Sequence, residues 1–326
     1  MESGESTLIP CDLPENLKAV YRTLLTREND ADKAKPPVVI VTTTCFGSPY
    51  TSDFLLALTI LKELRRLGLI KLRGIAVNVV PGELGFQDLS EYAIGSFLKK
   101  LGLDVSIVYE TGSESNTFLF RLLQTACKEG EKVTLLCLSS PLGMVEFLKT
   151  YPIVLSHSLA GGRVVFQDGY PADLKSNGFN HRPGFHERRA GPNFYKFLKE
   201  KKIPSIVFDR DITREFRDPL TAKMFDNNAN TEVGTELNLI AKGEYGADVT
   251  WSDALASASV IGDEAMLRLG VIKTPFPWCS QSIHQEVGSG REKLNVTGDG
   301  MRIALEALFR GSLLAIPQPL PSNPQT

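Results

Sequence analysis

The sequence predicts an α/β protein in which helices cover both faces of a mostly parallel sheet and a helical segment ends the chain. From Val38 onward, short apolar runs alternate with longer runs whose apolar residues recur at helical spacing. Short apolar strands of this kind are typical of a parallel sheet that is buried on both faces. From residue 213 the pattern is mainly helical, and the chain contains no internal repeat.

Each expected element rests on its local pattern. Leu17, Val20, Tyr21 and Leu24 form an apolar stripe at helical spacing, and Gly68 closes the helix that begins near residue 52. Strands are expected at 38–41, 70–80, 104–110, 132–140, 162–169 and 204–209. Helices are expected at 14–26, 52–67, 88–102, 116–128, 143–151, 192–202, 252–270 and 297–311.

The chain is expected to have one domain between two flanking segments. Residues 1–35 are interpreted as an N-terminal extension and linker, because the charged run RENDADKAKPP ends in a double proline. Residues 36–315 hold the α/β domain. Residues 316–326 are polar and rich in proline, so we expect a disordered tail.

Composition and charge exclude several classes of function. The chain has 326 residues, of which 42% are hydrophobic, and its formal net charge is −2. Without a basic patch or a polybasic anchor, we expect neither a nucleic-acid partner nor a membrane partner. No apolar run approaches transmembrane length, and the N-terminus lacks the apolar core of a signal peptide. The five cysteines are scattered without a CxxC pair, which indicates neither a zinc site nor a disulfide framework and favours a cytoplasmic location.

The first expected strand leads into a loop without charge. Residues 42–52, TTTCFGSPYTS, contain no ionisable carboxylate, amine or guanidinium group. In α/β proteins, ligands bind where the strands end at their carboxyl edge. A small-molecule site is therefore expected among the loops 42–52, 78–88, 139–143, 168–191 and 209–213.

The order of these segments resembles the inosine/uridine-preferring nucleoside hydrolases across roughly residues 36 to 315. The family opens with a strand, an aspartate-rich loop of the form DTDxGxDD and an apolar helix, and the first strand, loop and helix here occupy those places. Four further segments are similar to family motifs and come in the same order: GIAVNVV (74–80), LLCLSSPLGMV (135–145), RDIT (210–213) and SDALA (252–256). The resemblance implies a nucleoside-hydrolase-like fold and a homo-oligomer, either a dimer or a tetramer.

The resemblance also implies a specific chemistry, from which this sequence departs. In the family, aspartates hold a calcium ion that binds the ribose hydroxyls and a water, and an aspartate takes the proton of that water. Here Thr42 and Thr44 stand where the first two aspartates are expected. Ser52 replaces one aspartate of the closing pair, so that only Asp53 remains.

The later motifs depart in the same way. Ser252 stands at the family's histidine near the leaving group, whereas Asp253 keeps the last metal ligand. In GFH (184–186), His186 replaces the asparagine of a sugar-binding segment. Two remaining carboxylates cannot supply the six to eight oxygen ligands, several of them anionic, that calcium prefers. We therefore expect no bound metal and no cofactor.

Structural roles compete with functional ones at these positions. The threonines suit the β-branched end of a strand, and Asp53 and Asp253 each suit a helix N-terminus. His186 suits a solvated loop, and Trp251 suits core packing. The functional interpretation assigns catalysis to Thr42, Thr44, Asp53 and Asp253, and substrate binding to Ser48, Ser252, His186 and Trp251.

Three functional hypotheses follow. The first is an enzyme that has lost the metal-dependent hydrolytic site and acts without metal on an apolar substrate of a biosynthetic pathway. A cyclase or pericyclase such as a Diels–Alderase fits, because holding a reactive conformer supplies much of the acceleration of such reactions. The second is a genuine N-ribosyl hydrolase acting on purine or pyrimidine nucleosides. The third is a non-catalytic protein that binds a small metabolite.

Overall fold

The structure is a computed structural model that describes twelve stretches of the chain. They are residues 8–26, 35–45, 52–79, 95–110, 113–138, 142–167, 194, 196–208, 233–235, 252–274, 284–287 and 298–314.

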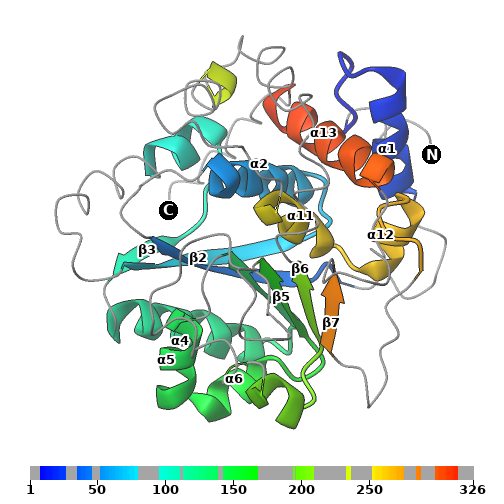
Figure 1. Cartoon of the computed structure of the whole chain (residues 1–326). Coiled ribbons are helices and arrows are strands. Elements are labelled where there is room, and N and C mark those ends of the chain that lie inside the picture. The colour runs from blue at the N-terminus through cyan, green and yellow to red at the C-terminus, as the bar shows by residue number, and fades with distance from the viewer. Residues whose placement is uncertain are drawn as a thin grey trace, which may run out of the picture.

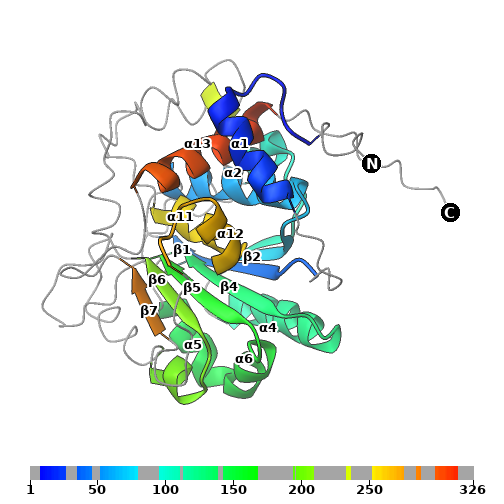
Figure 2. The ribbon, with the colours of Figure 1, turned by 90° about the vertical axis from the view of Figure 1, so that its right-hand side faces the viewer.

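A parallel sheet lies between two layers of helices (Figures 1 and 2). Its strand order is β3-β2-β1-β4-β5-β6-β7, and all neighbouring strands are parallel. The strands are β1 (Val38–Cys45), β2 (Lys71–Val79), β3 (Ile107–Glu110), β4 (Val133–Leu138), β5 (Arg163–Gln167), β6 (Ser205–Phe208) and β7 (His284–Val287). The expected α/β fold class is confirmed.

The helices fall into two groups by the core cluster that they help to form. The first group packs on what we call the α2/α11 face of the sheet, and the second packs on the opposite, α4/α6 face. The first group comprises α1 (Glu15–Leu25), α2 (Ser52–Arg66), the helical residues 95–101, α11 (Ser252–Ser259), α12 (Asp263–Arg268) and α13 (Gly298–Leu314). The second comprises α4 (Ser113–Lys128), α5 (Leu142–Thr150), α6 (Pro152–Ser158) and the helical residues 196–200.

Right-handed crossovers explain this division. From β1 to β3 the chain moves toward one edge of the sheet, so α2 and residues 95–101 lie on one face. After β3 it returns and moves toward the other edge, so α4, α5 and α6 lie on the opposite face. On the α2/α11 face, β4, β5 and β6 contact α11, which comes from the connection between β6 and β7.

One expected helix is divided in the structure, and two elements were not expected. The helix expected at 252–270 is two helices, because Gly262 between them has a φ of 107° that a helix cannot contain. The helix expected at 143–151 is followed directly by α6, which Pro152 opens near its first position. Strand β7 was not predicted, because its sequence HQEV has no apolar run and the strand lies at the edge of the sheet.

Helix α1 shares the core of the α2/α11 face. Its apolar stripe is buried, and it packs on α13. The fully buried Tyr21 donates a hydrogen bond to Glu63 of α2, whose carboxylate also accepts two bonds from Arg66 at 2.8 and 2.6 Å. Burial and the charge of Glu63 raise the pKa of Tyr21, so its hydroxyl remains a donor.

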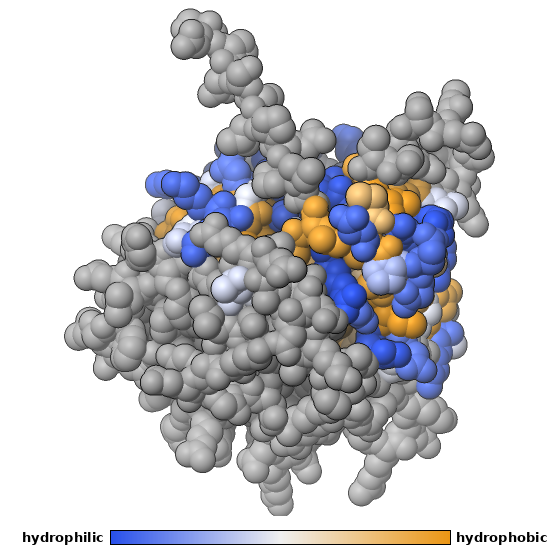
Figure 3. All heavy atoms as spheres, turned by 90° about the horizontal axis from the view of Figure 1, so that it is seen from above, coloured by the Kyte–Doolittle hydropathy of each residue, from blue (hydrophilic) through white to orange (hydrophobic). Residues whose placement is uncertain are grey.

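Seen from above, apolar and charged residues are mixed over the coloured part of the molecular surface (Figure 3).

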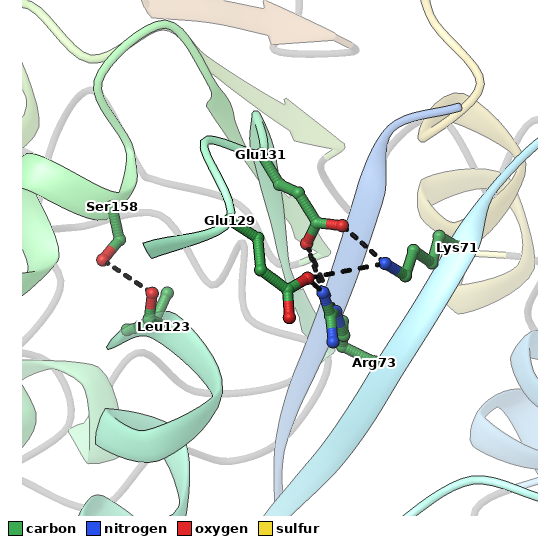
Figure 4. A network of polar contacts seen from close by, with 6 residues as sticks. All are labelled: Lys71, Arg73, Leu123, Glu129, Glu131 and Ser158. Carbon is green, nitrogen blue, oxygen red and sulfur yellow. Dashed lines mark hydrogen bonds and ion pairs between the residues drawn. The ribbon is translucent and has the colours of Figure 1, made fainter. Parts of the chain in front are cut away.

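An ion-pair network ties the amino end of β2 to the connection between α4 and β4 (Figure 4). Lys71 and Arg73 of β2 contact Glu131 at 2.5 and 2.7 Å, and both also pair with Glu129. Burial alone would raise the pKa of Glu131, but hydrogen bonds from Lys71 and Arg73 outweigh it and hold the pKa below the ordinary 4.5. The Glu131 carboxylate is therefore more favourable in the folded chain than in the unfolded chain.

Replacing Glu131 by glutamine is expected to lower the free energy of unfolding by about 1 kcal/mol at pH 7. Because the folded-state pKa is depressed, this contribution is complete above pH 4.5 and is lost as the pH falls through the folded-state value. Urea unfolding of both proteins at pH 7 and pH 3 measures the difference. Glu264→Gln, on the exposed surface of α12, is the control. An equal deficit for Glu131→Gln at both pH values would contradict the charge-based explanation.

Candidate functional site at the carboxyl edge of the sheet

The topology locates a candidate site between β1 and β4. The chain leaves β1 toward β2 and β3 and then returns to β4 on the other side of β1. In open α/β sheets, ligands bind at the carboxyl edge where the strand order reverses in this way. The expected loop 42–52 begins at this point, and its residues 46–51 lie outside the described stretches.

One row of side chains crosses the sheet at this edge. The strand register aligns Val77, Thr43, Leu138, Gln167 and Phe208 on neighbouring strands. Val77, Leu138 and Phe208 belong to the core of the α2/α11 face. Residues aligned across a parallel sheet share a face, so Thr43 and Gln167 point to the same side. We call these five residues the edge row, and none of them is charged.

The threonines of β1 have different surroundings. Thr43 donates its hydroxyl hydrogen to the carbonyl oxygen of Leu138 at 2.6 Å and so joins β1 to β4 at the switch point. Thr42 hydrogen-bonds Cys137, which belongs to the core of the opposite face. Burial raises the pKa of the Cys137 thiol to about 12, and the bond from Thr42 opposes that shift only partly. Thr44 is aligned with Asn78, and its side chain lies outside the described part of the chain.

These contacts limit what the threonines can do for a ligand. The hydroxyl hydrogen of Thr43 is already used, so only its oxygen lone pairs are available on the α2/α11 face. Thr42 lies on the other face, next to Cys137. A hydrogen-bond donor for a ligand at the edge row would have to come from a residue other than these threonines. Within the row, the other polar side chain is that of Gln167, which is aligned with Leu138.

Helix α11 brings Asp253 toward the same edge. Arg163, the first residue of β5, donates to the Ser259 carbonyl at 2.7 Å and to Asp263 at 2.9 Å, so the end of α11 lies over the amino end of β5. Burial lowers the pKa of Arg163, and the Asp263 carboxylate opposes this shift. Asp253, in the first turn of α11, lies about 9 Å from Ser259 along the helix. It therefore lies toward the carboxyl end of β5, where Gln167 is.

Asp253 is a buried carboxylate among the residues that the structure describes here. Its side chain is 6% exposed and is engaged in a polar contact. Its place in the first turn of α11 favours the charged form, because the positive end of the helix dipole lies there. Asp253 thus fits both the helix-terminus role and the site role that the sequence left open.

The structure does not test the expected roles of any of these site residues. Ser52 and Asp53 begin α2 and Ser252 begins α11, but their side chains are outside the described set. Ser48, His186 and Trp251 lie in undescribed stretches. These assignments stay predictions, as do the cytoplasmic location and the homo-oligomer. Gln167, the polar amide that ends the apolar run RVVF, was not among the predicted site residues.

The donor set at the edge row can be compared with the needs of calcium, the ion that the family resemblance implies. Among the described residues, no group of three or more His, Cys, Asp or Glu side chains could hold a metal ion. The described oxygen donors near the edge are Thr43, Gln167 and Asp253, of which one is a carboxylate. Calcium prefers several anionic oxygens, so these residues alone do not fit it. Of the described helices, none is long and apolar enough to cross a membrane.

Comparison with solved structures shows a nucleoside-hydrolase-like α/β fold. The effector protein XOO4466 has a TM-score of 0.66 at 16% identity, with 92% of this chain and 99% of that chain covered. The type III effector XopQ, solved in complex with adenosine diphosphate ribose, has the same values.

An inosine-uridine preferring nucleoside hydrolase from Bacillus anthracis has a TM-score of 0.54 at 15% identity, covering 86% of this chain and 100% of that chain. No family model matches the sequence, and no curated protein matches it. At these identities the likeness shows a divergent member of the fold and nothing about activity.

Proposed function

We propose that this protein is a metal-independent enzyme that binds a largely apolar small molecule at the carboxyl edge of the sheet and promotes its intramolecular cyclisation. The observation that carries the proposal is the edge row, whose aligned side chains are three hydrophobic groups and two uncharged polar groups. Four of these five side chains are buried in the fold, so we place the ligand beyond the carboxyl ends of their strands. A site next to such residues suits apolar ligands, since they bring no isolated charge to it.

A pericyclic ring closure matches what these residues offer. In a Diels–Alder closure, three π bonds become two σ bonds and one π bond, and no proton or leaving group is transferred. The reaction therefore needs neither a base nor a metal-bound water. It needs the diene and the alkene held in contact, and it benefits from a hydrogen bond to a carbonyl group on the alkene.

The second candidate is a protein that acts on N-ribosyl compounds. It is favoured by the likeness to XopQ, whose structure contains adenosine diphosphate ribose, and by the buried Asp253. The third candidate, a binding protein without catalysis, would use the same apolar surface. A triene that carries its diene and an activated alkene on one chain separates the first from the third. Only an enzyme would yield a cyclised product with one enantiomer in excess over the buffer blank.

Competition between ligand classes tests the first candidate against the second. Anilinonaphthalene sulfonate fluorescence reports an apolar site, and adamantane derivatives are expected to displace this dye. Adenosine diphosphate ribose and inosine are expected to leave the fluorescence unchanged. Displacement by the ribosyl compounds alone would favour the second candidate.

Nucleoside cleavage is expected to be absent. Purified protein should release no base from inosine or uridine above the buffer blank, with calcium or with a chelator, because the described donor set contains one carboxylate. Base release is followed by absorbance, and the bound metal is measured by elemental analysis. The Bacillus anthracis nucleoside hydrolase is the positive control. One stoichiometric calcium ion, lost together with inosine cleavage on chelation, would put the second candidate first.

A further inference from the structure

Strand β1 extends further along β2 than along β4. On the β2 side, the aligned pairs continue through Thr44 to Cys45, the last residue of β1. On the β4 side, the last aligned pair among the described residues is Thr43 with Leu138, where β4 ends. We call this end of the β1–β4 ladder the β1/β4 fork. In open α/β sheets, the ligand crevice lies outside the carboxyl ends of the strands at such a reversal of strand order.

A side-chain hydrogen bond joins the two strands at this fork. The Thr43 hydroxyl donates to the Leu138 carbonyl oxygen at 2.6 Å, within the range of a good O–H bond. Leu138 is 1% exposed and belongs to the core of the α2/α11 face, and it is also aligned with Gln167 of β5. The bond therefore ties the end of β1 to a strand end that packing and its other neighbour already hold in place.

Thr43 lies where the buried part of β1 gives way to the edge. Val41, two residues earlier on the same face, is fully buried in the core, whereas the Thr43 side chain is half-buried. A neutral hydrogen bond contributes a small part of the stability of a domain, so a variant without this bond should still fold. The main consequence of losing the bond is expected to be local, at the separation of the two strand ends.

We infer that Thr43 is a positioning residue for the proposed site, because its hydroxyl sets the width of the β1/β4 fork beyond which the ligand lies. It acts through the ends of β1 and β4 and needs no contact with the ligand. This inference rests on the proposed function, which places an apolar ligand beyond the carboxyl ends of these strands. The role differs from those predicted for Thr42 and Thr44, which involve direct contact with the ligand.

Three substitutions change the bond in different ways. Thr43→Val keeps the shape of the side chain but puts a methyl group in place of the hydroxyl, and carbon keeps about 3.3–3.6 Å from a carbonyl oxygen. Either the fork widens or the side chain turns away, and in both cases the tie between the strands is lost. Thr43→Ala removes the hydroxyl without adding bulk. Thr43→Ser keeps the hydroxyl and should keep the bond.

A rigid apolar probe is sensitive to the width of the fork. Adamantan-1-ol is a compact cage that cannot change its shape, and its displacement of anilinonaphthalene sulfonate gives its dissociation constant. Thr43→Val is expected to bind this probe about tenfold more weakly than wild type, because a small gap already weakens dispersion contacts. Thr43→Ala should also bind more weakly, and Thr43→Ser should stay within about twofold of wild type.

A matched control and a stability measurement separate positioning from packing. Thr134→Val makes the same change on β4, near the amino end of the same ladder, where Thr134 is aligned with Val39. It should bind the probe as wild type does. A variant that merely loosened the core would expose apolar surface and bind more of the dye, so weaker binding cannot arise in that way. Urea unfolding establishes that each variant is folded and unfolds cooperatively.

The outcomes distinguish the inference from the proposed function. If adamantan-1-ol displaces no dye from wild-type protein, the apolar site is wrong, and the role of Thr43 is wrong with it. If wild type binds the probe and folded Thr43→Val binds it equally well, the role of Thr43 is wrong and the apolar site stands. Equal weakening in Thr43→Ser or Thr134→Val would also overturn the inference, since neither change removes the bond. If Thr43→Val fails to fold, the same comparison is made with Thr43→Ala: unchanged affinity overturns the inference, and weaker binding supports it.

Discussion

Removal of residues 1–26 is expected to prevent the chain from folding. Residues 1–26 supply five buried side chains to the core of the α2/α11 face, four from α1 and one from the residues before it: Leu13, Leu17, Val20, Tyr21 and Leu24. Burial of each contributes about 1.5–3 kcal/mol, so their loss approaches the whole stability of a typical domain. The truncation would also expose the apolar side of α13 that α1 covers.

Soluble expression and circular dichroism measure this effect. Arg22→Ala is the control, because Arg22 lies on the exposed side of α1 and its pair with Glu15 is a surface contact. The control should unfold at the wild-type urea concentration. A truncated protein that stays soluble and unfolds cooperatively at the same concentration would show that residues 1–26 are a dispensable extension.

The sheet was predictable because its central strands carry continuous apolar runs. Val38–Val41, for example, is buried on both faces and could belong only to an interior strand. Strand β7 has no such run, and it exists because the edge of β6 offers backbone hydrogen bonds to any extended segment that reaches it. The pattern of α1 likewise predicts a helix but not its partner. Its packing depends on contacts such as that between Tyr21 and the Ala307 carbonyl, 286 residues apart.

The location of the candidate site could be predicted from the sequence, but the side chains that lie there were harder to predict. Parallel strands bring their carboxyl ends to one edge, which the order of elements already implies. Which threonine faces which layer depends on the strand register, and a shift of one residue exchanges Thr42 and Thr43. The hydrogen bond from Thr43 to Leu138 requires β4 to lie beside β1, and nothing local predicts that. Gln167 becomes visible as a candidate only when its burial and its alignment with Leu138 are known.

Gly311→Ala is expected to lower the free energy of unfolding by about 2–4 kcal/mol. A Cβ atom at this position of α13 would overlap the Tyr21 hydroxyl oxygen and lie 2.6 Å from Tyr21 Cζ and 3.0 Å from Glu63 Oε1. Alanine favours a helix by up to about 1 kcal/mol over glycine, which is too little to offset the overlap. Tyr21 would have to move and weaken its bond to the buried Glu63 carboxylate.

Urea unfolding of four proteins measures this contact: wild type, Gly311→Ala, Tyr21→Phe and the double variant. In the Tyr21→Phe background the nearest atom is gone, so Gly311→Ala should cost at least about 1 kcal/mol less than in wild type. Gly95→Ala is the matched glycine control, because it is also helical and a Cβ there meets nothing within 4 Å. It should be neutral or slightly stabilising, with the same effect in both backgrounds. Additive costs for Gly311→Ala and Tyr21→Phe would mean that α1 and α13 do not meet through this pair.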